Sequence, residues 1–106
     1  MQEFPVKRTN LKTFRKDMVT ALGDIFATVP REKGEKFEIV YGALERLTVW
    51  AGEGGKTLCV ESVSRKDVPD ETILDTNRRF REFLERVTGY TAKERVKMAK
   101  KKAEEG

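Results

Sequence analysis

The stretch Lys36–Ser64 shows three runs in which apolar and polar residues alternate. Alternation with a period of two, in runs rich in β-branched and aromatic residues, is typical of half-buried strands. The runs are Lys36–Tyr41, Glu45–Ala51 and Thr57–Ser64, and they are joined by Gly42-Ala43 and by a glycine-rich segment, Gly52–Gly55. Such short links predict an antiparallel meander.

Helical periodicity flanks the meander on both sides. Apolar residues recur at steps of three and four from Leu11 to Phe26, and again from Ile73 to Val87. This spacing predicts two long amphipathic helices. The second stripe is expected to contain Ile73, Asn77, Phe80, Leu84 and Val87, with Phe83 at its flank. Together the patterns predict one shared core of Phe14, Leu22, Ile39, Val49, Val60, Phe80 and Leu84.

The second long helix is expected to start within 67–71, around Pro69, and to end at Gly89. A short strand over 3–8 and a last helix, opened by a capping box at Thr91-Ala92-Lys93-Glu94, complete the predicted elements, while 31–35 is expected to form a surface loop. The fold class is therefore α+β, in the order strand, helix, three strands, helix, helix. We expect a four-stranded antiparallel sheet with two long helices packed on one face. Residues 1–90 would form a single domain and 91–106 a basic C-terminal helix.

The element order resembles, as topology, TATA-binding-protein-like and helix-grip arrangements, and fold alone does not imply function. The span RRFREFLERVTGYTAKERVKMAKKK, residues 78–102, resembles a small archaeal protein family of unknown function. This resemblance implies a stand-alone archaeal domain, and it supplies no catalytic motif.

Composition excludes several chemistries. The chain has 106 residues, no histidine and one cysteine. Catalytic dyads or triads that need imidazole are therefore excluded, and so are zinc sites built from imidazole or from several thiolates. We expect no cofactor, no metal and no catalytic residue, and we expect a binding protein rather than an enzyme. No apolar stretch is long enough to span a membrane and no leader pattern is present, so the lone Cys59 favours a cytoplasmic protein.

Two local motifs resemble functional sites, but a structural interpretation is favoured for each. Gly54-Gly55-Lys56-Thr57 resembles the end of a phosphate-binding loop, but the first glycine of that motif is replaced by Trp50 and a strand follows instead of a helix, so a hairpin turn is favoured. The mixture of basic and aromatic residues over 77–83 is favoured as one face of a core helix.

Positive charge is concentrated at the two ends of the chain. The net charge is +4 overall, with +4 in residues 1–16, +3 in residues 91–106 and −3 between them. A basic run can contact nucleic-acid phosphates or simply keep a protein soluble. The candidate nucleic-acid contacts in the C-terminal run are Lys93, Lys97, Lys100 and Lys101.

Apolar residues also occur on the face of the sheet opposite the predicted core. They are Val40, Trp50, Cys59 and Val63, and an apolar cluster there would need a cover. A second copy of the chain is the favoured cover, which predicts a homodimer. Three classes of function stay open: a self-associating protein-interaction domain, a nucleic-acid-binding protein, and a small-molecule binder with a cavity between helix and sheet.

Overall fold

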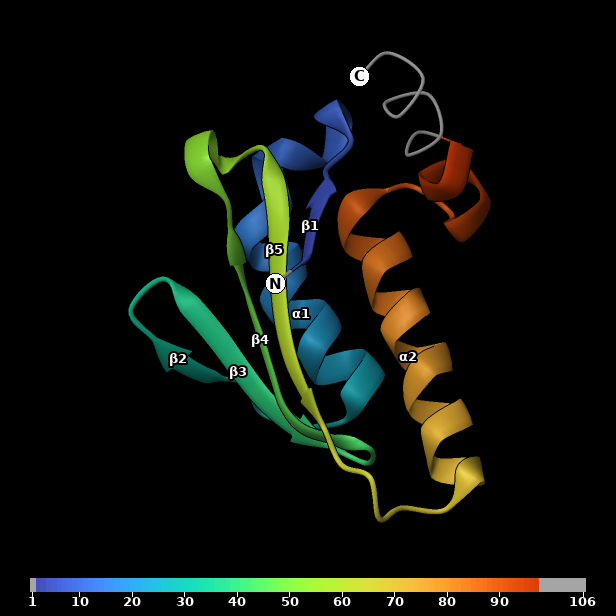
Figure 1. The fold of residues 1–106 in the computed structure, drawn as a ribbon. Coiled ribbons are helices and arrows are strands. Elements are labelled where there is room, and N and C mark those ends of the chain that lie inside the picture. The colour runs from blue at the N-terminus through green and yellow to red at the C-terminus, as the bar shows by residue number, and fades with distance from the viewer. Residues whose placement is uncertain (1, 98–106) are drawn as a thin grey trace.

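The computed structural model describes residues 2–97 and contains one antiparallel sheet of five strands (Figure 1). The strands are β1 (Gln2–Pro5), β2 (Arg31–Lys33), β3 (Lys36–Tyr41), β4 (Leu44–Ala51) and β5 (Thr57–Ser64), in the spatial order β1-β5-β4-β3-β2. A 3₁₀ segment, η1 (Arg8–Thr13), leads into α1 (Phe14–Phe26), and α2 (Asp70–Thr88) follows the sheet. A further 3₁₀ turn, η2 (Glu53–Gly55), joins β4 to β5.

The expectation of four strands is wrong because of β2. Its three residues, Arg31, Glu32 and Lys33, are all charged and exposed, so they show no alternation from which a strand can be predicted. They pair with β3 at the edge of the sheet, Arg31 opposite Glu38 and Lys33 opposite Lys36. A short charged edge strand leaves little to pair with another sheet.

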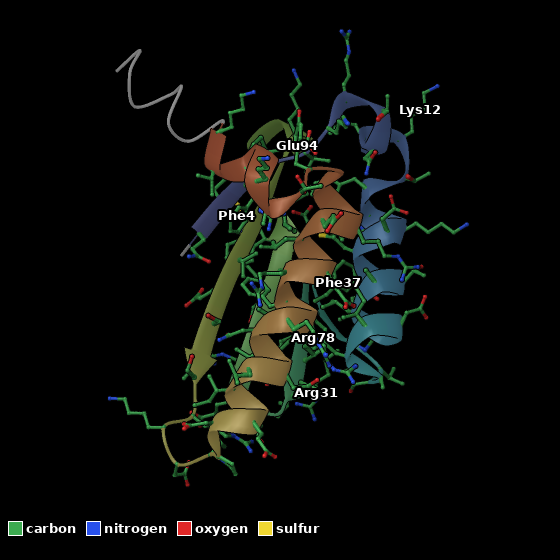
Figure 2. The ribbon with its side chains drawn as sticks, turned by 90° about the vertical axis from the view of Figure 1, so that its right-hand side faces the viewer. Phe4, Lys12, Arg31, Phe37, Arg78 and Glu94 are labelled. Carbon is green, nitrogen blue, oxygen red and sulfur yellow. The ribbon has the colours of Figure 1, made fainter. Side chains whose placement is uncertain are left out.

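The core lies between the sheet and the two helices, which Figures 1 and 2 show on the same side of the strands. From the sheet, Ile39, Leu47, Val49, Leu58 and Val60 are buried, and they pack with Phe14, Met18, Leu22, Phe26, Phe83, Leu84 and Val87 of the helices in one cluster. Six of the seven predicted core residues belong to the buried part of this cluster. The exception is Phe80, which is only partly buried.

The predicted stripe on α2 is rotated relative to the observed one. Phe83 is fully buried, at 0% exposure, and Thr76 is 2% exposed, whereas Asn77 is exposed. The hydroxyl of Thr76 donates to the carbonyl of Thr72 at 2.7 Å and accepts from the amide of Ala43 at 3.1 Å. A buried threonine is therefore tolerated here because its hydroxyl is paired with two backbone groups.

A clasp of polar groups fixes α2 to β3 and to the end of α1. The Tyr41 hydroxyl donates to Asp75 at 2.7 Å, and Arg79 forms a salt bridge with Asp75 at 3.1 Å. Arg79 also donates to the carbonyl of Ile25. The Tyr41 hydrogen bond is the main reason that the pKa of Asp75 lies below its ordinary value, and the same bond is the main reason that the pKa of Tyr41 is raised.

Both ends of α2 are as the sequence predicts. The helix begins at Asp70 directly after Pro69, and it ends at Gly89, which adopts a left-handed conformation with φ of 80°. A new helix begins at Ala92. Its capping box is confirmed: the amide of Thr91 donates to the Glu94 carboxylate at 3.1 Å, and the Glu94 amide donates to the Thr91 hydroxyl at 3.2 Å. No helix within residues 2–97 is long and apolar enough to cross a membrane.

Candidate functional site: a basic pole and an adjacent pocket

The structure brings the two basic segments of the chain to one end of the molecule. Figure 2 shows Lys12 of η1 and Glu94 of the last helix at the same end. Seven exposed cationic residues belong to these two segments, and we call them the basic pole: Lys7, Arg8, Lys12, Arg15, Lys16, Lys93 and Lys97. The sequence shows both charge runs, but it does not show that they lie at the same end of the folded chain.

Hydrogen bonds fix the N-terminal segment of the basic pole to the end of α2. The amide of Lys7 donates to the carbonyl of Thr88 at 2.7 Å, and the side-chain amide of Asn10 donates to the carbonyl of Val87 at 3.4 Å. Beyond the end of α2, the Tyr90 ring lies under the Lys7 ammonium group. The N-terminal segment is thus fixed directly to the junction from which the C-terminal basic helix departs.

Most members of the basic pole form no salt bridge with a described residue, although the charge of Lys7 acts on nearby Glu94. Arg15 pairs with Glu32 at 3.2 Å, and the other members form no salt bridge with another residue in 2–97. The acids nearest in sequence serve local roles: Asp17 accepts from the Thr13 hydroxyl at 2.8 Å. Glu94 is held by the capping box, and its hydrogen bonds to Thr91 lower its pKa.

Of the four predicted nucleic-acid contacts, Lys93 and Lys97 are exposed in the basic pole, and Lys100 and Lys101 lie outside the described residues. The structure adds a group that the sequence did not suggest. Tyr90 is only half-buried and supplies an aromatic ring beside Lys7 of the basic pole. Its amide donates to the Thr88 hydroxyl at 3.2 Å, so the position of the residue is fixed by the end of α2.

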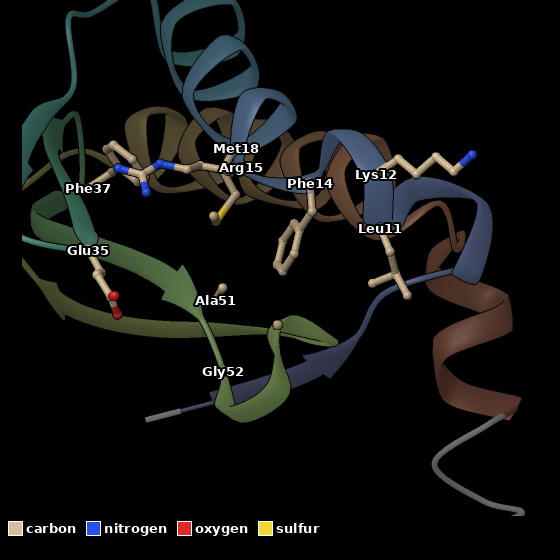
Figure 3. A pocket seen from close by; sticks show the side chains of 10 residues that line it. Leu11, Lys12, Phe14, Arg15, Met18, Glu35, Phe37, Ala51 and Gly52 are labelled. Atoms are coloured by element: carbon tan, nitrogen blue, oxygen red, sulfur yellow. The ribbon is translucent and has the colours of Figure 1, made fainter.

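A pocket of about 390 Å³ opens between η1, the start of α1 and the ends of β3 and β4 (Figure 3). Polar and apolar groups contribute about equally to its walls. Arg15 and Glu35 are charged residues of the lining, whereas the Lys12 side chain points away from the pocket in Figure 3. The Arg15 guanidinium lies 5.5 Å from the centre of the Phe37 ring. The lining residues are Leu11, Lys12, Phe14, Arg15, Met18, Glu35, Phe37, Ala51, Gly52 and Gly55. Concave sites that combine apolar side chains with polar groups can hold small organic ligands.

The glycine-rich segment that borders this pocket is a turn, as the sequence predicts. Gly54 and Gly55 both have positive φ, and the amide of Gly55 donates to the carbonyl of Gly52 at 2.9 Å. Gly52 approaches Thr57 and Glu3 so closely that a Cβ there would meet the Thr57 hydroxyl at 2.1 Å. A side chain at position 52 would therefore collide with β5.

The opposite face of the sheet, which we call the outer face, carries the four predicted interface residues, Val40, Trp50, Cys59 and Val63. Neither α1 nor α2 covers it in Figure 1, and Val40 is 53% and Val63 37% exposed. Trp50 and Cys59 are direct neighbours across β4 and β5. A row of polar residues, Glu38, Thr48 and Glu61, crosses the outer face between this pair and the two valines.

The outer face is therefore less apolar than the alternation suggests. The Lys36 ammonium lies 4.3 Å from the centre of the Trp50 ring and covers part of it. Cys59 is 4% exposed, and its thiol lies 3.6 Å from the Glu3 carboxylate. Burial, followed by the hydrogen bond to Glu3, raises the pKa of Cys59, so this thiol is a poor nucleophile at neutral pH.

The described residues offer few groups for other chemistry. Within residues 2–97 there is no cluster of three or more Cys, Asp or Glu that could hold a metal ion. The Tyr41, Asp75 and Arg79 side chains are engaged with one another.

No curated protein and no solved structure matches the chain. The model of a domain family of unknown function, DUF5611, matches residues 1–101, and the chain therefore belongs to that family.

Proposed function

We propose that this domain binds nucleic acid, and that the basic pole is the surface that contacts the phosphates. The observation that carries the proposal is that Lys7 and Asn10 of the N-terminal basic segment bond to Thr88 and Val87 at the end of α2, from which the C-terminal basic segment continues. Exposed lysines and arginines that lack acidic partners release counterions from nucleic acid when they neutralise phosphates, and this release favours binding.

The other features of the chain are compatible with this proposal. The expected cytoplasmic location would give access to nucleic acid. The resemblance of the element order to TATA-binding-protein-like domains supplies no function by itself, because one topology hosts many functions. The archaeal origin implied by the sequence resemblance also stays a prediction.

The test is the binding of fluorescently labelled DNA and RNA oligonucleotides, followed by anisotropy at several salt concentrations. The double variant Lys12→Glu/Lys16→Glu reverses two charges of the basic pole near the start of α1, where acidic residues favour the helix. The matched control, Arg65→Glu/Lys66→Glu, changes the net charge equally in the exposed segment after β5.

We expect the pole variant to weaken binding at least about tenfold and to reduce the dependence of log affinity on log salt by about one to two units. The control should leave that dependence unchanged. Equal losses in both variants would show that net charge alone attracts the nucleic acid. The absence of binding by the wild type at low salt would refute the proposal.

A second candidate function is self-association through the outer face, with a second copy as the partner. The exposed side chains of Val40 and Val63 favour it, since burying them against the same residues of another copy would remove apolar surface from water. The polar row between the valines and Trp50 makes this contact smaller than the sequence predicts.

A further inference from the structure

We propose that the pocket beside the basic pole receives one unpaired base, so that the domain binds single-stranded nucleic acid in preference to duplexes. This inference rests on the proposed function. Its starting point is that Lys12 and Arg15 line two hollows at once. One is the pocket, and the other is a shallow surface on the start of α1 formed with Thr13, Lys16, Val19 and Thr20.

The shared rim places a phosphate surface directly beside a pocket that has both apolar and polar walls. A strand whose phosphates follow Lys12, Arg15 and Lys16 has its bases within reach of the opening. Proteins that bind single strands combine a basic track with apolar or aromatic surfaces that receive bases. In a duplex the bases are paired and stacked, and they would have to be extruded first.

Leu11 and Ala51 provide the accessible apolar surface of the pocket, because Phe14 and Met18 are only 4% and 1% exposed. Figure 3 shows Phe14 and Met18 directed from α1 toward β4, with Leu11 beside them. Ala51 and Gly52 form the opposite wall, and their small size keeps the space open. A volume of about 390 Å³ lies at the lower end of the range of small-ligand pockets, which is ample for one base.

Glu35 decides between two kinds of ligand. Glu35 lines the same pocket as Lys12 and Arg15, its side chain is directed away from Arg15 in Figure 3, and Arg15 is already paired with Glu32. A small organic anion would therefore meet an acid inside the pocket. A base is neutral, and a carboxylate accepts hydrogen bonds from exocyclic amino groups, as glutamate does with cytosine. The site should thus prefer cytosine to thymine or uracil.

The experiment compares three ligands of equal length: a cytosine oligonucleotide, its duplex, and a strand with abasic sites that keeps the phosphates. Ala51→Phe fills the pocket without changing charge. Val29→Phe adds the same side chain at a position that is 88% exposed and outside the pocket. Thermal melting establishes that each variant is folded before binding is measured.

We expect the wild type to bind the cytosine strand about tenfold more tightly than the abasic strand, as stacking of one base implies. Ala51→Phe should remove this difference and leave the abasic and duplex affinities unchanged, whereas Val29→Phe should have no effect. Glu35→Ala should reduce the preference for cytosine over thymine. Glu35→Ala therefore tests the pocket without introducing a larger side chain.

The two proposals fail in different ways. If Ala51→Phe and Glu35→Ala leave all affinities unchanged while Lys12→Glu/Lys16→Glu weakens them, phosphates bind the basic pole but no base enters the pocket. If Ala51→Phe lowers the affinity for all three ligands equally, the pocket is not a base site either. If the wild type binds none of the three at low salt, both proposals are refuted.

Discussion

The ammonium group of Lys7 lies 5.6 Å from the centre of the Tyr90 ring. This cation–π contact joins the segment that leads into η1 to the turn that follows α2. A cation over an aromatic face contributes about 0.5–1 kcal/mol at an exposed site, so the contact supports the junction without being its main stabilisation. The backbone bond from Lys7 to Thr88 and the close packing around Gly89 contribute the rest.

Gly89→Ala should destabilise the protein by about 2–4 kcal/mol, because the residue has φ of 80° and its new Cβ would lie 3.0 Å from both the Lys7 Cβ and the Asn10 side-chain nitrogen. Gly34→Ala is the matched control. Gly34 also has positive φ, 63°, but no atom would lie within 4 Å of a Cβ there, so about 1–2 kcal/mol is expected. Urea unfolding of both variants measures the difference, and equal losses would mean that the junction is loosely packed.

Phe83→Ala should cost about 3–5 kcal/mol, since Phe83 is fully buried and its ring centre lies 6.2 Å from that of Phe26. Phe80→Ala should cost distinctly less because Phe80 is only partly buried. Chemical denaturation of the two variants side by side tests the observed orientation of α2. A larger loss for Phe80→Ala would restore the orientation expected from the sequence.

The Tyr41–Asp75 hydrogen bond predicts how stability depends on pH. The pKa of Asp75 is lowered from its ordinary 3.8, so its stabilisation is present above that value and is lost as the pH falls through the folded-state pKa. The pKa of Tyr41 is raised from 10.0, so its stabilisation is present below pH 10 and is lost as the pH rises through the folded-state value. The clasp therefore stabilises the fold fully between about pH 4 and pH 10.

Tyr41→Phe removes the hydroxyl and leaves Arg78 and Arg79 beside the carboxylate. The pKa of Asp75 should then rise toward its ordinary value, as carbon-detected NMR titration would show. The loss of stability between pH 7 and pH 3 should also become smaller than in the wild type. An unchanged Asp75 titration would indicate that the arginines, and not Tyr41, set its pKa.

Removal of all residues after Gly89 should weaken nucleic-acid binding and flatten its salt dependence, because Tyr90, Lys93 and Lys97 leave the basic pole. Lys93→Gln/Lys97→Gln in the full chain isolates the charge from the ring. We expect this variant to lose the share of the salt dependence that Lys93 and Lys97 contribute while it keeps the part of the affinity that comes from Tyr90. Anisotropy with one oligonucleotide compares the three proteins, and an unchanged affinity after truncation would confine the site to the N-terminal segment.

Val40→Lys/Val63→Lys should abolish self-association through the outer face, because two charges would have to be buried at the contact. Leu74→Lys, at a residue of α2 that is 68% exposed, is the control. Light scattering should find a dimer for the wild type and the control, and a monomer for the double variant. Trp50, the single tryptophan of the chain, should shift its emission to the red on dilution. A monomeric wild type at high concentration would refute the dimer.

The sequence predicts most of the elements because each depends on local alternation or local caps. The strand Thr57–Ser64 has the predicted bounds, and α2 ends at the predicted glycine. The edge strand Arg31–Lys33 was missed because it has no buried side. The orientation of α2 was misjudged because phenylalanines occur at both 80 and 83, and only tertiary packing against Phe26 selects between them.

Prediction of the candidate site was limited by distance along the chain. Charge counting identifies both basic segments, but the bonds that unite them join Lys7 to Thr88 and Asn10 to Val87. The pocket likewise combines η1 and α1 with Phe37, Ala51 and Gly52 of the meander. No local sequence pattern predicts these contacts, because they depend on the order of the strands in the sheet.

That sheet order also sets the sequence of folding events. Strands β2 to β5 follow one another through short turns and can pair as soon as each is made. By contrast, β1 pairs only with β5, and the Glu3 carboxylate accepts from a Thr57 hydroxyl that is 54 positions away in the sequence. Closing so long a loop carries an entropic cost and slows folding. The residues of β1 precede the meander in the chain and are thus among the last to find their partners, and the basic pole is complete only when the helix after α2 has been synthesised.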